Sequence, residues 1–147
     1  MAKTIHIYTD ASSKDTTMFP QGVKRTVKVG VIVINSNIVD IYYNREEKFI
    51  KSYLAELQAI IESVNYVRKK YHSNNLIVYT DVLPIAESIK TANKHGIKIN
   101  YVKGHCPNRS GFKYKFNCLA DWISKKGINT WRNYYYRHLL GWKTLNF

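Results

Sequence analysis

The 147-residue sequence contains only two cysteines, three prolines and seven glycines. Because the cysteines have no CxxC spacing, they predict neither a disulfide framework nor a zinc site, and we expect Cys106 and Cys118 to be reduced thiols. The scarcity of proline and glycine argues against a long disordered linker. No apolar run approaches the roughly 20 residues that cross a bilayer, and no signal-peptide core is evident. We therefore expect a cytoplasmic protein without a membrane partner.

Acidic residues are scarce as well. Ten Asp and Glu stand against 23 Lys and Arg, which gives a formal net charge of +13. So positive a protein attracts polyanions, and nucleic acid is the commonest of these. An anionic membrane surface is the alternative, but no polybasic run lies beside an apolar anchor. The length and an apolar content of 45% predict one folded domain.

The order of the apolar patterns predicts an α/β fold. Strands are expected at residues 3–9, 26–34, 38–44, 76–81 and 97–102. Helices are expected at residues 51–70, 83–95 and 117–126. A tight turn at residues 35–37 makes the first three strands an antiparallel meander, and the later strand–helix–strand units add parallel strands. The result is a mixed five-stranded sheet with helices packed on both faces.

The helix at residues 51–70 has one apolar face, with residues spaced three and four apart. This predicted core face consists of Tyr53, Leu57, Ile60, Val64 and Val67. Glu56 lies one turn into the same helix among apolar neighbours, so it faces either solvent or a site.

Three further acids lie near the ends of predicted elements. Asp10 and Asp81 end their strands in the similar contexts IYTD and VYTD, so neighbouring parallel strands would place both carboxylates at one edge of the sheet. Asp121, in NCLAD, is either a first-turn acid favoured by the helix dipole or part of the same group. Clustered carboxylates repel one another unless a cation is present, and oxygen ligands favour magnesium or manganese over zinc. With the basic surface, the pattern predicts a metal-dependent nuclease.

The ordered set YTDAS, LAELQAI, VYTD, VKGH and NCLAD, from about residue 4 to 126, resembles the type 1 ribonuclease H family. The resemblance implies a ribonuclease H-like catalytic domain over residues 1–127. It also implies an endoribonuclease that hydrolyses the RNA strand of RNA/DNA hybrids with two Mg²⁺ ions, for which Mn²⁺ can substitute. The expected products have 5′-phosphate and 3′-hydroxyl ends.

The resemblance also assigns roles to individual residues. Asp10, Glu56, Asp81 and Asp121 match the family's metal-binding acids. His105 matches a catalytic histidine on a mobile loop, where an imidazole suits proton transfer near neutral pH. Asn117 matches an asparagine that supports the site or the RNA strand, although as a residue by itself it is an equally good helix N-cap.

The sequence departs from the family around its substrate contacts. IKSYLAE, before Glu56, lacks the paired asparagines with which many members grip the hybrid, and Val82 and Leu83 replace a polar pair. Sugar and phosphate contacts need only short polar or cationic side chains. The candidates near the acids are Ser12, Ser13, Lys51 and Ser52. Residues 106–116 form either a solvated loop or a basic clamp, with Arg109, Lys113 and Lys115 as further candidates.

Residues 128–147 lie beyond the resemblance. Their Trp, Tyr and Leu predict a basic aromatic extension packed on or flanking the domain, while Arg132, Arg137, His138 and Lys143 keep a nucleic-acid grip as the alternative. Other functions for the whole chain are a non-catalytic nucleic-acid-binding module, a superfamily nuclease such as a resolvase or exonuclease, or a piece of a reverse transcriptase. The four acids, VKGH and Met1 favour a free-standing ribonuclease H, which we expect to be a monomer.

Overall fold

The computed structural model describes residues 3–15, 22–73, 75–92, 97–102 and 112–140. The strands in these ranges are β1 (Ile5–Asp15), β2 (Lys24–Ile34), β3 (Asn37–Glu46), β4 (Leu76–Thr80) and β5 (Ile97–Tyr101). The helices are α1 (Ser52–Tyr71), α2 (Leu83–Ala92), α3 (Phe112–Lys126) and α4 (Trp131–Tyr134), and α4 continues into a π-helical segment, η1 (Tyr135–Leu140).

The strands form one mixed sheet in the order β3-β2-β1-β4-β5. β1 pairs antiparallel with β2, and β2 pairs antiparallel with β3. β4 lies parallel to both β1 and β5. Asn35 and Ser36 make the turn between β2 and β3 with positive φ angles, a conformation that asparagine tolerates better than most residues. The predicted mixed five-stranded sheet, with its first three strands antiparallel, is confirmed.

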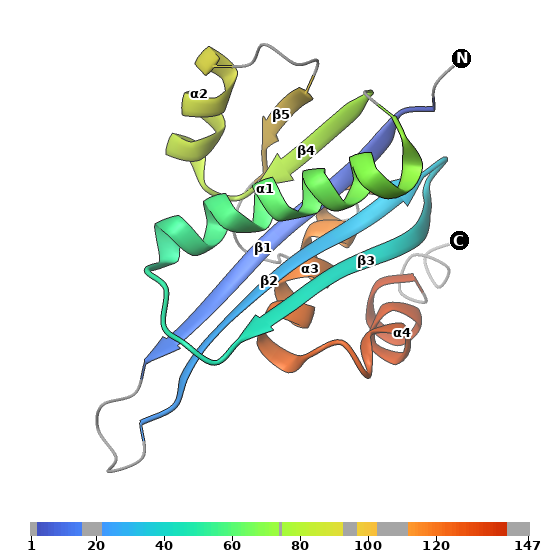
Figure 1. Ribbon diagram of the computed structural model, residues 1–147. Coiled ribbons are helices and arrows are strands. Elements are labelled where there is room, and N and C mark those ends of the chain that lie inside the picture. The colour runs from blue at the N-terminus through green and yellow to red at the C-terminus, as the bar shows by residue number, and fades with distance from the viewer. Residues whose placement is uncertain (1–2, 16–21, 74, 93–96, 103–111, 141–147) are drawn as a thin grey trace.

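The sheet has a hydrophobic core on each face. Figure 1 shows α1 crossing in front of the sheet and α3 behind it. On the α1 face, Ile7 and Ile32 of the sheet pack with Ile60 of α1 and with α2. On the α3 face, Tyr8 packs with Phe116 of α3. Fully burying side chains of this size stabilises the fold by about 1.5 to 3 kcal/mol each, so both helical layers are firmly attached.

Helix α1 lies unusually close to β2. A Cβ atom added to Gly30 would lie 2.3 Å from Ser63 Oγ and 2.8 Å from Ser63 Cβ, so only glycine fits at this position. The prediction that Tyr53 belongs to the core face is wrong, because its side chain is 48% exposed. The buried face instead includes Glu56, Ala59 and Ser63, and these small or polar side chains allow the close approach.

Helix α3 begins at Phe112, five residues before the predicted start. Phe116, Leu119 and Ile123 are all fully buried at helical spacing, so the apolar face extends the helix toward its amino end. Asn117 therefore lies inside the helix, and its interpretation as an N-cap is wrong. Cys118, also on α3, is disulfide-bonded, which corrects the prediction of a reduced thiol there. Cys106 lies outside the described residues.

The described part of the carboxy-terminal segment packs against α3 and the sheet. Tyr135 is buried in the core on the α3 face, and Trp131 packs against the same cluster. The Tyr134 ring stacks on Trp122 of α3 with their centroids 4.6 Å apart. Among the helices described, none is long and apolar enough to span a membrane.

Candidate active site

Asp10 lies in the middle of β1, which corrects the prediction that it ends the strand. β1 stays paired with β2 as far as Asp15, but its parallel pairing with β4 stops at Tyr8 and Tyr79. The run after Asp10 lacks clear apolar alternation, so the continuing hairpin gave no sequence signal. Asp10 nevertheless lies just beyond the last rung shared with β4, and Asp81 directly follows the end of β4.

The third acid reaches this edge from α1. Glu56 is 7% exposed and Asp10 is 4% exposed, so neither carboxylate is on the solvent face. The Ala11 N–H donates to Glu56 Oε1 at 3.1 Å and connects the helix to β1. One carboxylate oxygen each from Asp10, Glu56 and Asp81 lies within 4.8 Å of the other two. Three acids far apart in the sequence thus meet at one point.

The electrostatics of this group favour a cation. Burial raises the pKa of Asp10 well above its usual range, and repulsion from Glu56 and Asp81 raises it further. Burial, followed by repulsion from Asp81, raises the pKa of Glu56 to about 7. Both shifts show that ionising these groups is costly in the protein alone.

Asp121 approaches the group from α3. Its charge contributes to the raised pKa values of Asp10 and Glu56, so it is an electrostatic neighbour of both. Asp121 also forms an ion pair with Lys125 at 3.1 Å. It lies inside α3, with no acid in the first turn, which excludes its interpretation as a first-turn acid.

Ser124 is a site residue that sequence reasoning missed. Its buried hydroxyl lies 3.2 Å from Asp10 Oδ2 and 2.8 Å from the Asp121 carbonyl oxygen, so its single proton has two acceptors. The Ser12 hydroxyl donates to the Ser124 carbonyl oxygen at 2.6 Å. These contacts fix α3 beside β1. A serine three residues after an aspartate is too common a pattern to have indicated this role.

The donor set fits a divalent metal ion. Carboxylate oxygens are the ligands that magnesium and manganese prefer. Glu56 Oε2 is buried and has no hydrogen-bond partner among the described residues. Such an orphaned buried oxygen is normally satisfied by a partner, and a bound cation would supply it. Asp10, Glu56 and Asp81 would hold the ion, with Asp121 beside them.

The two serines of β1 that are predicted as substrate contacts are already hydrogen-bonded within the protein. Ser12 is engaged with α3, and Ser13 lies 3.5 Å from the Thr26 hydroxyl, which donates to it. Lys51 and Ser52 are both exposed at the start of α1.

On α3, the ammonium group of Lys115 lies 5.0 Å from the centre of the Phe116 ring, and Asn117 is buried. These positions correct the prediction of a loop as far as residue 116. His105, Arg109 and the side chain of Lys113 lie outside the described residues.

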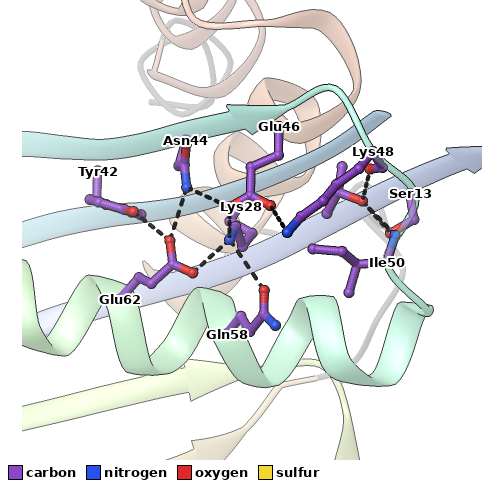
Figure 2. Close-up of polar contacts among 10 residues, drawn as sticks. Ser13, Lys28, Tyr42, Asn44, Glu46, Lys48, Ile50, Gln58 and Glu62 are labelled. Atoms are coloured by element: carbon purple, nitrogen blue, oxygen red, sulfur yellow. Dashed lines mark hydrogen bonds and ion pairs between the residues drawn. The ribbon is translucent and has the colours of Figure 1, made fainter. Parts of the chain in front are cut away.

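A second polar cluster, also missed, holds α1 against β2 and β3 (Figure 2). Lys28 is 1% exposed, and its ammonium group contacts Glu62 at 2.6 Å, Glu46 at 3.0 Å and Gln58 at 3.2 Å. Burial opposes its charge, but the bonds to Glu62 and Glu46 outweigh burial and raise its pKa. Lys28 stands directly opposite Ala11, whose N–H binds Glu56. The cluster therefore fixes the helix one rung away from the acids.

No protein-family model and no curated protein sequence matches this chain. Among solved structures, it is similar to a foamy viral protease-reverse transcriptase in complex with double-stranded DNA, with a TM-score of 0.64, 16% identity, and coverage of 87% of this chain and 96% of that one.

It is also similar to ribonuclease H1 from the halophilic archaeon Halobacterium salinarum, with a TM-score of 0.54, 13% identity and coverage of 68% and 86%. LC11-RNase H1 in complex with an RNA/DNA hybrid gives a TM-score of 0.52, 12% identity and coverage of 67% and 85%. The strand order, the two helical layers and these likenesses together identify the fold of this chain as ribonuclease H-like.

Proposed function

We propose that this protein is a metal-dependent endoribonuclease that hydrolyses the RNA strand of RNA/DNA hybrids and leaves 5′-phosphate and 3′-hydroxyl ends. The observation that carries the proposal is the meeting of Asp10, Glu56 and Asp81 within 4.8 Å, at the carboxyl edge of a ribonuclease H-like sheet. The net charge of +13 suits a polyanionic substrate.

Each acid has a distinct part in the proposed site. Asp10 and Glu56 are buried and anchored by Ser124 and Ala11, so they present fixed oxygens. Asp81 is half-buried and directly follows the end of β4. Asp121 is close to Lys125, which balances part of its charge. We propose two Mg²⁺ ions as the occupants, with Mn²⁺ as a substitute.

When bound, such ions supply a nucleophilic water near neutral pH and stabilise the charge that develops on the leaving oxygen. The protein contributes orientation: β1, β4, α1 and α3 hold the carboxylates before any ligand arrives, which avoids an ordering cost during the reaction. The main chain beside Asp10 is held by continuous pairing with β2. We keep His105 as the proposed proton-transfer group.

The test is cleavage of four labelled substrates of one sequence: an RNA/DNA hybrid, single-stranded RNA, double-stranded RNA and duplex DNA. Each is incubated with Mg²⁺, with Mn²⁺ or with a chelator. We expect metal-dependent cutting of the RNA strand of the hybrid, with 5′-phosphate ends identified by end-specific ligation.

Asp10→Asn should abolish cutting because it removes a metal ligand. Asp15→Asn is the matched control, since Asp15 lies on the same strand, is exposed and is five residues from Asp10; it should cut normally. Cutting of a different substrate would favour a resolvase or exonuclease. Tight hybrid binding by the unaltered protein, without any cutting, would favour a binding module.

A further inference from the structure

The hairpin of β1 and β2 continues well past the acid group. After Asp10, five more residue pairs follow without a break, from Ala11 opposite Lys28 to Asp15 opposite Lys24. Figure 1 shows these strand ends projecting from the body at the lower left, beyond the start of α1. β3 pairs with β2 as far as Thr26, so only the last two pairs of the hairpin, Lys14 with Arg25 and Asp15 with Lys24, form a two-stranded arm. The site lies near the base of this hairpin.

Two cations of this arm lie on the same face of the sheet as the Asp10 side chain. Successive side chains of a strand alternate between faces, so Asp10, Ser12 and Lys14 share one face. The contact between Ser12 and Ser124 identifies it as the α3 face. Arg25 is paired directly opposite Lys14, so its side chain lies on this face too.

The pairing of Lys14 with Arg25 is electrostatically unfavourable in the protein without a ligand. Like charges directly opposite each other in an antiparallel pair destabilise the pairing. Some other cations of the chain form ion pairs, among them Lys28, Arg45, Lys70 and Lys125. In the described part of the chain, neither Lys14 nor Arg25 has an ion-pair partner within 4 Å, and Lys14 is exposed. Asp15, the neighbouring acid, points to the opposite face.

An extended polyanion would remove this repulsion by binding both cations. At about 3.4 Å per residue, Lys14 lies roughly 14 Å along the strand from Asp10. A nucleic-acid duplex covers that distance in about four base pairs. A duplex that lies along β1 with its scissile phosphate at the acids therefore has backbone phosphates within reach of the arm.

We propose that Lys14 and Arg25 form a phosphate-binding clamp that grips the backbone of the duplex a few base pairs from the point of cleavage. This inference rests on the proposed function and adds a binding surface to it. The clamp contacts phosphates alone, so it contributes affinity and register without reading the base sequence.

The test reverses the charge of Lys14, a change that is expected to have opposite effects on protein stability and on hybrid binding. Lys14→Glu creates an opposite-charge pair with Arg25, so the melting temperature should stay the same or rise. Hybrid binding should weaken, because one phosphate contact is lost and the other cation is neutralised. Lys69→Glu is the matched control: Lys69 is exposed in the last turn of α1, at the far end of the helix from Glu56, and its reversal changes the net charge equally.

Binding is measured in the Asp10→Asn chain with Mg²⁺, as log Kd against log salt concentration. Each phosphate contact contributes about 0.9 to this slope, so Lys14→Glu should reduce it by up to about 1.8, and Lys69→Glu should leave it nearly unchanged. If Lys14→Glu and Lys69→Glu gave equal slopes while the Asp10→Asn chain still bound the hybrid, the clamp would be refuted but the proposed function would not. Absence of hybrid binding and cutting by the unaltered protein would overturn the proposed function as well.

Discussion

Raising the pH from 5 to 8 in the presence of a chelator should destabilise this protein. Glu56 is buried beside Asp10 and Asp81, and its pKa rises from 4.5 to about 7 on folding. Between these two values the folded protein binds more protons than the unfolded chain, so the free energy of unfolding falls as the pH rises. The raised pKa of Asp10 acts in the same direction.

The size of the effect follows from linkage. One pKa unit corresponds to about 1.4 kcal/mol, so the shift of Glu56 alone predicts a loss of about 3 kcal/mol between pH 4.5 and pH 7. The acids around Lys28 do not mask this change. The pKa of Glu46 and that of Glu62 are lowered, so their stabilising effect is lost only below about pH 4.5.

The assay is urea unfolding at pH 5 and pH 8 with EDTA, for the unaltered protein and for Glu56→Gln. The variant should lose the part of the pH dependence that comes from Glu56, about 3 kcal/mol, because its amide cannot ionise, while the part that comes from buried Asp10 should remain. Glu47→Gln, an exposed residue next to β3, should retain it. Added Mg²⁺ should restore stability at pH 8 in the unaltered protein and in Glu47→Gln, but not in Glu56→Gln. Equal pH dependence in the unaltered protein and Glu56→Gln would refute the reasoning.

Three further changes test how the helices are held. Lys28→Met should lower the free energy of unfolding, measured with urea, by about 3 kcal/mol because Glu62 loses its buried partner. The double variant Lys28→Met with Glu62→Gln should recover part of the lost stability. Gly30→Ala should lower the free energy of unfolding by about 1 to 3 kcal/mol and weaken metal binding measured by calorimetry, because its Cβ would displace Ser63 and α1. Adding Ser63→Gly should restore metal binding but not the full stability, since a glycine inside α1 itself costs about 1 kcal/mol; a failure to restore metal binding would contradict the steric explanation. Tyr135→Ala should cost about 3 kcal/mol by thermal melting, whereas no change would mean that η1 does not stabilise the core.

The sequence predicted the neighbouring positions of two acids correctly where a strand pattern and the expected order of strands pointed to the same edge of the sheet. The contexts IYTD and VYTD placed Asp10 and Asp81 on neighbouring parallel strands, and the structure has these strands paired. The end of β1 was predicted wrongly because ASSKD has no apolar alternation. Its pairing comes from β2 across the hairpin, which is information that the strand itself does not carry.

Helical periodicity was misleading for α1 because it counts apolar residues only. Tyr53 fits the apolar spacing, yet it is exposed, while the charged Glu56 is buried. Sequence patterns place apolar residues in the core and acids on the surface. They therefore fail at a functional site, where an acid such as Glu56 is buried at a cost in stability. Lys28 could not have been predicted either, since Glu46 and Glu62 lie 18 and 34 residues further along the chain.

The position of Lys28 bears on what the acid group is for. A buried ammonium group is present one rung from the acids, on the residue opposite Ala11. All three of its protons are directed to Glu62, Glu46 and Gln58. Among the described residues, no cation lies within ion-pair distance of Asp10 or Glu56, whose pKa values are both raised by burial and by repulsion from Asp81. A group needed only for folding would be most stable with that lysine beside it. Because the chain directs its buried cation to other acids, the charge at Asp10 and Glu56 is best balanced by a cation from outside, as the proposed reaction requires.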